Sequence, residues 1–276
     1  MNLRCRKKKL KFKLLLFTVL PRIILRPTLL AVNSCGRKVY HSQSDEEHLL
    51  DEAINQLNVN SREIYFFEFG FGPTEFNCTR LSHRRFFGVL IDQQIDVVKI
   101  AKKVLHKNTR VLNSLLKPSD LDGIFKSGNF NVISIDVDGI DYEFAQVAFL
   151  QRPDILIVEY NSVFGDKRAK VPYSENFNRS NFHGNFHGAS LLAFVDLAHE
   201  HGYCLWGTSE SAVNAFFVPS TLGPIDCVGN LKSGLMKNSL GIKSKFGEIP
   251  WQMLFEELKD LPIEYLKASS SKCQNL

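Results

Sequence analysis

The sequence predicts an α/β fold in which a doubly wound, mostly parallel sheet carries helices on both faces and ends in a C-terminal antiparallel hairpin strand. Two observations support this prediction. Short apolar runs alternate with amphipathic stretches from residue 46 to residue 202, a pattern typical of a parallel sheet covered by helices. The last two runs, 203–207 and 213–218, are separated only by a short polar turn, and so short a connection favours a hairpin.

Each element is predicted from the period of its apolar residues. Residues 46–57 carry apolar side chains at helical spacing and form the first predicted helix. The strands are predicted from short apolar runs bounded by polar or turn-forming residues. Strands are expected near 64–69, 86–91, 109–113, 131–136, 154–159, 203–207 and 213–218, and further helices near 75–82, 93–105, 142–150 and 189–202.

Length and composition fit one globular domain with tails. The chain has 276 residues, 44% of them hydrophobic, and contains 22 Phe, so it can bury a sizeable core. We expect a basic and apolar tail at 1–44, the α/β domain at 45–220, and a C-terminal helical extension and tail at 221–276. Residues 160–188 form a long polar and aromatic insertion, and a loop of that length predicts a substrate lid.

The net charge of +5 is concentrated at the N-terminus. The first 44 residues hold 11 Lys or Arg and no acidic residue. The rest of the chain has 23 basic and 29 acidic residues, so it is mildly acidic. An acidic body argues against a nucleic-acid groove. The apolar run at 14–20 is too short to span a bilayer, which needs about 20 residues. Three interpretations of the segment remain: a disordered tail, peripheral membrane contact through residues 1–38, and an organellar presequence.

The cysteines predict reduced thiols. The six residues stand at positions 5, 35, 78, 204, 227 and 273, with no C-x-x-C pair and no regular spacing. Such usage is typical of a reducing setting and argues against a zinc site. The expected location is therefore cytoplasmic.

A glycine turn follows the first predicted strand. Gly70 and Gly72 let the backbone turn tightly and approach a ligand closely, directly after Glu68. Asp92 ends the next strand, 24 residues after Glu68, where a carboxylate can accept both ribose hydroxyls. Asn113 ends the third strand and could reach the edge of an adenine. The alternatives are a helix cap for Asp92 and loop capping for Asn113.

The glycine turn and the hairpin together resemble class I S-adenosylmethionine-dependent methyltransferases, over roughly residues 60–220. These enzymes have a Rossmann-like sheet that ends in such a hairpin, and an E/D-x-G-x-G turn that residues 68–72 match. More narrowly, the Ile-Asp-Val-Asp-Gly run at 135–139, followed by the Ile-Leu-Ile-Val-Glu run at 155–159, is similar to FkbM-type methyltransferases. The resemblance implies that residues 45–220 are a methyltransferase-like domain.

The resemblance also implies a reaction and a cofactor. The expected reaction is O-methylation of a hydroxyl on a small polar or sugar-like acceptor, with S-adenosylmethionine as the methyl donor. The only expected partner of the domain is this small molecule. The residues that the resemblance implies for cofactor binding are Glu68, Gly70, Gly72, Asp92, Asn113 and Asp136.

Oxygen ligands gather at the ends of the fourth and fifth strands. Asp136, Asp138 and Asp141 lie within six residues, and like charges that close need a cation, hydrogen-bond donors or water. Metal-dependent O-methyltransferases of similar fold hold Mg²⁺ with acidic and Asn ligands at these two strand ends. The resemblance thus implies Mg²⁺ bound by Asp136, Asp138, Glu159 and Asn161. A solvated cluster without metal is the alternative.

Two histidines in the insertion are candidate general bases. His183 and His187 are four residues apart, but the glycines around them favour a loop over a helix, so a His–His metal pair is not expected. Surface histidines without a role are the alternative. Together with Asp138, they complete the predicted catalytic residues.

Two other functions fit part of the sequence. The run Asp136-Val137-Asp138 also resembles the D-x-D motif of metal-dependent glycosyltransferases, although that interpretation leaves the glycine turn and Asp92 without a role. The second alternative is a catalytically silent methyltransferase-like domain. It would bind a cofactor or partner and be tethered to a membrane by its basic N-terminus.

Overall fold

The structure is a computed structural model. It describes residues 42, 44–57, 63–72, 75–126, 128–182, 184–222, 225–239, 242–244, 247–249 and 251–268. The predictions for residues 1–38 and for His183 lie outside these ranges. None of the helices within them combines the length and apolar character that crossing a membrane requires.

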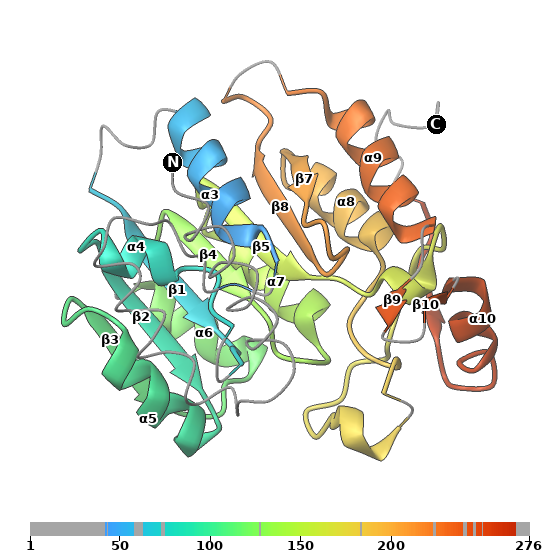
Figure 1. Ribbon diagram of the computed structural model, residues 1–276, viewed down its shortest axis with the longest axis horizontal. Helices are drawn as coiled ribbons and strands as arrows, with labels where there is room; N and C mark the ends of the chain where they lie inside the picture. The colour runs from blue at the N-terminus through green and yellow to red at the C-terminus, as the bar shows by residue number, and fades with distance from the viewer. Residues whose placement is uncertain are drawn as a thin grey trace, which may run out of the picture.

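Seven strands form one mixed sheet, which confirms the predicted fold class. They are β1 Tyr65–Phe69, β2 Phe87–Asp92, β3 Thr109–Asn113, β4 Val132–Ile135, β5 Ile155–Glu159, β7 Tyr203–Thr208 and β8 Asn214–Pro219. Their order across the sheet is β3-β2-β1-β4-β5-β8-β7 (Figure 1). The first five are parallel to one another, and β8 pairs antiparallel with both β5 and β7. The predicted hairpin is therefore present, and it closes one edge of the sheet.

Successive strand residues point into two separate cores, one on each face of the sheet. In β1, Phe67 and Phe69 belong to one core, whereas Phe66 belongs to the other. This alternation follows from the two-residue period of a strand. One core is covered by α6 Pro118–Lys126, α7 Asp141–Leu150 and α8 Leu191–Glu200, and the other by α3 Glu46–Gln56, α4 Thr79–His83 and α5 Ile95–Val104.

The C-terminal region packs against the insertion that precedes α8. Its elements are α9 Cys227–Ser239, β9 Ile242–Ser244, β10 Gly247–Ile249, α10 Trp251–Glu256 and β11 Glu264–Tyr265. β11 pairs antiparallel with β6, Ala169–Lys170, inside the insertion. Leu258 is completely buried in a third apolar cluster with Phe164 and Phe186. Residues 251–266 are therefore part of the folded body.

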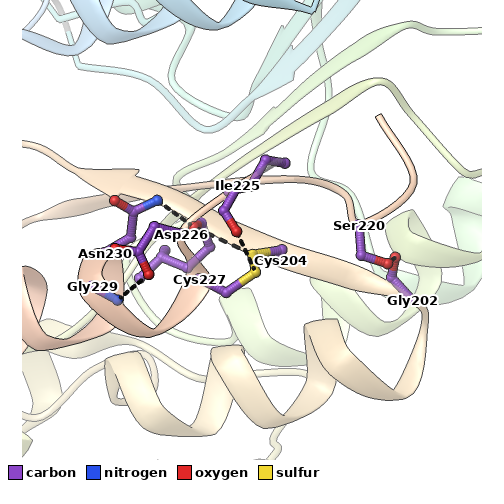
Figure 2. The surroundings of a disulfide bond; sticks show 9 residues. Gly202, Cys204, Ser220, Ile225, Asp226, Cys227, Gly229 and Asn230 are labelled. Carbon is purple, nitrogen blue, oxygen red and sulfur yellow. Dashed lines mark hydrogen bonds between the residues drawn. A yellow bond between two sulfur atoms is a disulfide. The ribbon is translucent and has the colours of Figure 1, made fainter. Parts of the chain in front are cut away.

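A disulfide joins the edge strand β7 to the first residue of α9. Cys204 and Cys227 form this bond, with their Cα atoms 5.6 Å apart (Figure 2). The prediction of reduced thiols is wrong for this pair, whereas Cys78 is a free, buried thiol. Sequence spacing did not reveal the bond because it depends on α9 returning to β7. Beside it, the Asn230 side-chain amide donates to the Leu205 carbonyl at 3.0 Å, so α9 is held to β7 at two points.

Removing the disulfide should destabilise the fold. The bond closes a loop of 23 residues, and closing a loop of that size stabilises a protein by about 3 kcal/mol. We expect Cys204→Ser combined with Cys227→Ser to lower the free energy of unfolding by about that amount, measured by urea denaturation. Dithiothreitol should lower the wild-type value to that of the double variant and leave the variant unchanged. A wild type that does not respond to the reductant would contradict this expectation.

Leu258 should matter as much as a residue of the central core. Because its side chain is fully buried, we expect Leu258→Ala to lower the free energy of unfolding by about 2–4 kcal/mol, measured by urea denaturation. Met253→Ala is the matched control, since Met253 belongs to the same C-terminal region but is 65% exposed. Equal effects of the two substitutions would show that this region does not pack as described.

Candidate functional site

A cavity of about 700 Å³ opens where the parallel strands end. Its walls include the last residues of β1, β2 and β5 and the segment that follows β4. The winding of the sheet reverses between β1 and β4, because β1 is flanked by β2 on one side and by β4 on the other. In open α/β sheets, ligands bind outside the carboxyl ends of the strands at such a reversal point.

The turn after β1 depends on glycine at position 70. Gly70 has a φ of +67°, and a Cβ atom there would lie 1.7 Å from the Asp136 carbonyl oxygen. The Gly70 amide donates to the Ile91 carbonyl at 3.0 Å. The turn is thereby held between the ends of β2 and β4, and Gly70, Phe71 and Gly72 line the cavity.

Glu68 lies behind the turn and does not line the cavity. Its two carboxylate oxygens accept hydrogen bonds from the Asn77 and Cys78 amides, at 2.7 and 3.0 Å. Burial raises the pKa of Glu68 to about 7, and these two hydrogen bonds oppose the shift. The carboxylate therefore positions the segment that leads into α4, and the structure gives it no direct access to a ligand.

Asp92 connects the end of β2 to the glycine turn and lines the cavity. One of its carboxylate oxygens accepts from the Phe71 amide at 3.3 Å and the other from the Gln94 amide at 2.6 Å. Burial raises its pKa. An ionised carboxylate has about four lone-pair sites, so each oxygen can accept one more hydrogen bond. Supporting the turn before α5 and binding a ligand are therefore compatible roles.

Asn113 caps a loop instead of facing the cavity. Its side-chain amide donates to the carbonyls of Asp92 and Gln93, at 2.9 and 2.8 Å. It is not among the cavity-lining residues, whereas Ser114, Leu115 and Leu116 are. The structure therefore supports the loop-capping alternative for Asn113. The three residues that follow it line the cavity instead.

Three carboxylates converge at the ends of β4 and β5. Oxygen atoms of Asp136, Asp138 and Glu159 lie within 4.8 Å of one another. Burial, followed by repulsion from neighbouring carboxylates, raises the pKa of Asp136 and of Glu159 well above the usual range. Arg179, in the 3₁₀-helix η3 Arg179–Asn181, donates to Asp138 at 2.5 Å. Arg179 was not predicted as a site residue because arginines are common in loops.

Asp141 shapes the segment that carries Asp138. Its two carboxylate oxygens accept from the amides of Val137 and Gly139, at 2.8 and 3.0 Å. Between them, Asp138 has a φ of +58°, a left-handed conformation that costs a non-glycine residue about 1–2 kcal/mol. Asp141 is completely buried, and burial raises its pKa to about 6. It is a positioning residue, and its place in the acidic cluster after β4 was the only signal of it in the sequence.

Asn161, a predicted metal ligand, lines the cavity but also ties the insertion together. Its amide oxygen accepts from the Val163 amide at 3.0 Å. Its NH₂ group donates to the carbonyls of Asn185 and His187, at 2.7 and 2.9 Å. The side chain thus ties the start of the insertion to its end, and its hydrogen-bonding groups already have backbone partners.

His187 lies at the carboxylate cluster. Its Nδ1 atom is 3.8 Å from Glu159 Oε2, and neither atom has a hydrogen-bond partner among the described residues. The His187 and Glu159 residues are only 8% and 9% exposed. Burial lowers the pKa of His187 to about 3, so the ring is neutral at pH 7. Such a ring is a weak proton acceptor, but it offers a lone pair to a ligand.

The insertion covers one side of the cavity. Residues 175–179 line it, and the Phe177 ring would be 2.3 Å from a Cβ atom at Gly139, so the lid packs directly on the segment after β4. At the surface, Lys117 and Glu175 form an ion pair of 2.6 Å that joins the lid to the loop after β3. Tyr160 donates its hydroxyl to Asn238 of α9 at 2.9 Å.

Comparisons with known proteins do not assign the chain to a family. No protein-family model and no curated protein matches the sequence. Similar solved structures include a protein from Lactococcus lactis named as a hemolysin, with 13% identity, coverage of 73% of this chain and 100% of that chain, and a TM-score of 0.49. A TehB-like S-adenosylmethionine-dependent methyltransferase from Corynebacterium glutamicum has 12% identity, coverage of 72% and 97%, and a TM-score of 0.36.

Another similar structure is the magnesium protoporphyrin IX methyltransferase of Synechocystis with bound S-adenosylhomocysteine. Its identity to this chain is 10% and its TM-score is 0.40. The match covers 63% of this chain and 83% of that chain. Methyltransferases are thus among the structures that resemble the chain. At such identities the activity has to be argued from the residues of the chain itself.

Alanine at position 70 should disrupt the site. We expect Gly70→Ala to lower the free energy of unfolding by about 2–5 kcal/mol, because the methyl group would collide with the Asp136 carbonyl in a left-handed conformation. Urea denaturation measures the effect. Gly123→Ala is the matched control, because a Cβ there has no atom within 4 Å and lies in a helix; it should be neutral or slightly stabilising. Similar losses for both variants would contradict the described turn.

Proposed function

We propose that the protein is an S-adenosylmethionine-dependent methyltransferase that acts on a hydroxyl oxygen of a small polar, sugar-like acceptor. The observation that carries this proposal is the hydrogen bond between Asp92 and the Phe71 amide. It joins a carboxylate at the end of β2 to the glycine turn after β1, and both face one cavity. Such an arrangement can hold a nucleoside, with the ribose on the carboxylate beside a tight backbone turn.

The residues present fit this cofactor. Asp92 would accept hydrogen bonds from the ribose hydroxyls, and Leu115 and Leu116 would contact the adenine. S-adenosylmethionine carries positive charges on its sulfur and its amino group and a negative charge on its carboxylate, so it is a net cation. Among the described residues that line the cavity, six have carboxylates, and Arg179 is the only Lys or Arg. Because a cleft lined by one sign of charge attracts the opposite sign, this cavity favours a cationic ligand.

The acceptor half of the cavity suits a molecule with several hydroxyls. When bound, S-adenosylmethionine would supply a methyl group attached to a positively charged sulfur. Asp138 and Glu159, at neighbouring strand ends, can accept hydrogen bonds from an acceptor hydroxyl and can take its proton. Holding the hydroxyl in place is the main contribution expected from the protein. The neutral polar side chains around them are Ser162, Asn176, Asn178, Asn185 and Ser211.

Titration calorimetry with S-adenosylmethionine tests the cofactor. We expect the wild type to bind one molecule per chain and Asp92→Ala to bind about 10- to 100-fold more weakly, because hydrogen bonds to a charged group contribute about 1.5–3 kcal/mol. Asp92→Asn retains an acceptor for the turn and separates ligand binding from folding. The matched control is Asp96→Ala, on an α5 side chain that is 87% exposed, which should bind like the wild type.

The same titration, together with an assay of methyl transfer, separates the methyltransferase from the two alternative functions. A folded wild type that does not bind S-adenosylmethionine would overturn the proposal. Binding of a nucleoside-diphosphate sugar with Mn²⁺ in its place would support the D-x-D glycosyltransferase. Binding of S-adenosylmethionine without methyl transfer to any of a panel of sugars and polyols would support a catalytically silent domain.

A further inference from the structure

The chain enters the described structure beside the wall of the cavity. Asp45 Oδ1 accepts a hydrogen bond from the Glu210 amide at 2.8 Å, and Glu46 Oε1 accepts one from the Ser211 hydroxyl at 3.4 Å. Ser211 lines the cavity and lies just before β8, whose first residue pairs with Glu159 at the end of β5. The segment that precedes residue 44 is therefore attached at the edge of the sheet where the cavity opens.

The cavity carries more negative charge than the described residues compensate. Of its six carboxylates, Asp138 pairs with Arg179, and Glu175 pairs with Lys117. Three others have no Lys or Arg partner within the described ranges, namely Asp92, Asp136 and Glu159. Glu159 is only 9% exposed, and its Oε2 atom has no hydrogen bond to a described residue. A buried carboxylate without compensation is unfavourable, so this cavity attracts a positively charged occupant.

The same chain contains a strongly basic segment. Residues 4–13 hold seven Lys or Arg and no acidic residue. Lys13 is 29 positions before Ser42, and a chain of that length can span up to about 100 Å, so the segment can reach the cavity. Because both belong to one molecule, they meet at an effective concentration on the order of 1 mM. A weak attraction is therefore sufficient to bring them together.

We propose that the basic segment 4–13 binds at the mouth of the acidic cavity and competes there with cationic ligands, so that it acts as an autoinhibitor. The ligand with which it competes is S-adenosylmethionine, a net cation, and this consequence rests on the proposed function. A segment that occupies the cavity for nine-tenths of the time would raise the apparent dissociation constant of the ligand about 10-fold. Salt should release the segment, because it screens attraction between exposed charges.

Cross-linking of the full chain tests this contact without S-adenosylmethionine. A water-soluble carbodiimide joins a lysine amine to a carboxylate that it touches, and peptide mass spectrometry identifies the pair. We expect lysines of the segment to join to Asp138 or Glu175, whose side chains are 63% and 53% exposed at the cavity. Asp122 and Glu256 are the matched controls, since they are 63% and 69% exposed and do not line the cavity. The controls should not react with the segment.

Titration of full-chain variants with S-adenosylmethionine measures the competition. The test variant removes the five lysine charges of the segment together: Lys7→Gln, Lys8→Gln, Lys9→Gln, Lys11→Gln and Lys13→Gln. At low salt it should bind S-adenosylmethionine about 3- to 10-fold more tightly than the wild type, because the cavity is then mostly free. The matched control changes the same five lysines to arginine, which keeps every charge, and should bind like the wild type. In 1 M salt, where the screening length is about 3 Å, all three proteins should bind alike.

Wild-type cross-links that avoid the cavity, or that reach Asp122 and Glu256 equally, would overturn the inference. So would a glutamine variant that binds S-adenosylmethionine no more tightly than the arginine variant. If the segment binds phosphatidylserine vesicles and forms no cross-link to the cavity, it is a membrane contact instead. Cross-links to the cavity in a protein that does not bind S-adenosylmethionine would overturn the proposed function alone. Binding of S-adenosylmethionine without such cross-links would overturn the autoinhibition alone.

Discussion

The contact between the turn after β1 and the end of β4 is the constraint on which the site depends. Because Gly70 has no side chain, its backbone lies against the Asp136 carbonyl, where a Cβ atom would be 1.7 Å away. The hydrogen bond from Phe71 to Asp92 holds the same turn from the β2 side. The half of the cavity that we propose for the nucleoside and the half that holds the carboxylates are therefore placed relative to each other by backbone packing.

Parts of the chain outside the sheet determine the shape of the other half of the cavity. Asn161 binds the backbone at the far end of the insertion, and Leu258 packs beneath it with Phe164 and Phe186. These contacts join segments that are up to about a hundred residues apart in sequence. The position of His187, at the end of the insertion, therefore depends on residues outside the sheet.

The sheet could be predicted from sequence because its strands are continuous apolar runs, whereas α6 was missed. Gly123 lies inside that helix, and only two of its side chains are buried, so its period is weak. Strand-end carboxylates were predictable because parallel topology gathers them at one edge. The role of Asn161 was not predictable, because the backbone groups that its amide contacts are brought to it by the fold of the insertion. The bond between Cys204 and Cys227 was not predictable either, because it forms only when α9 returns to the edge strand.

The ion pair between Lys117 and Glu175 joins the insertion to the body at the surface, and both side chains are about half exposed. Dissolved ions weaken attraction between exposed charges, over a screening length of about 8 Å at physiological ionic strength. The apolar packing of Phe177 on Gly139 does not weaken in this way. Ionic strength should therefore act on one edge of the insertion and not on its base, so that salt loosens one contact and spares the other.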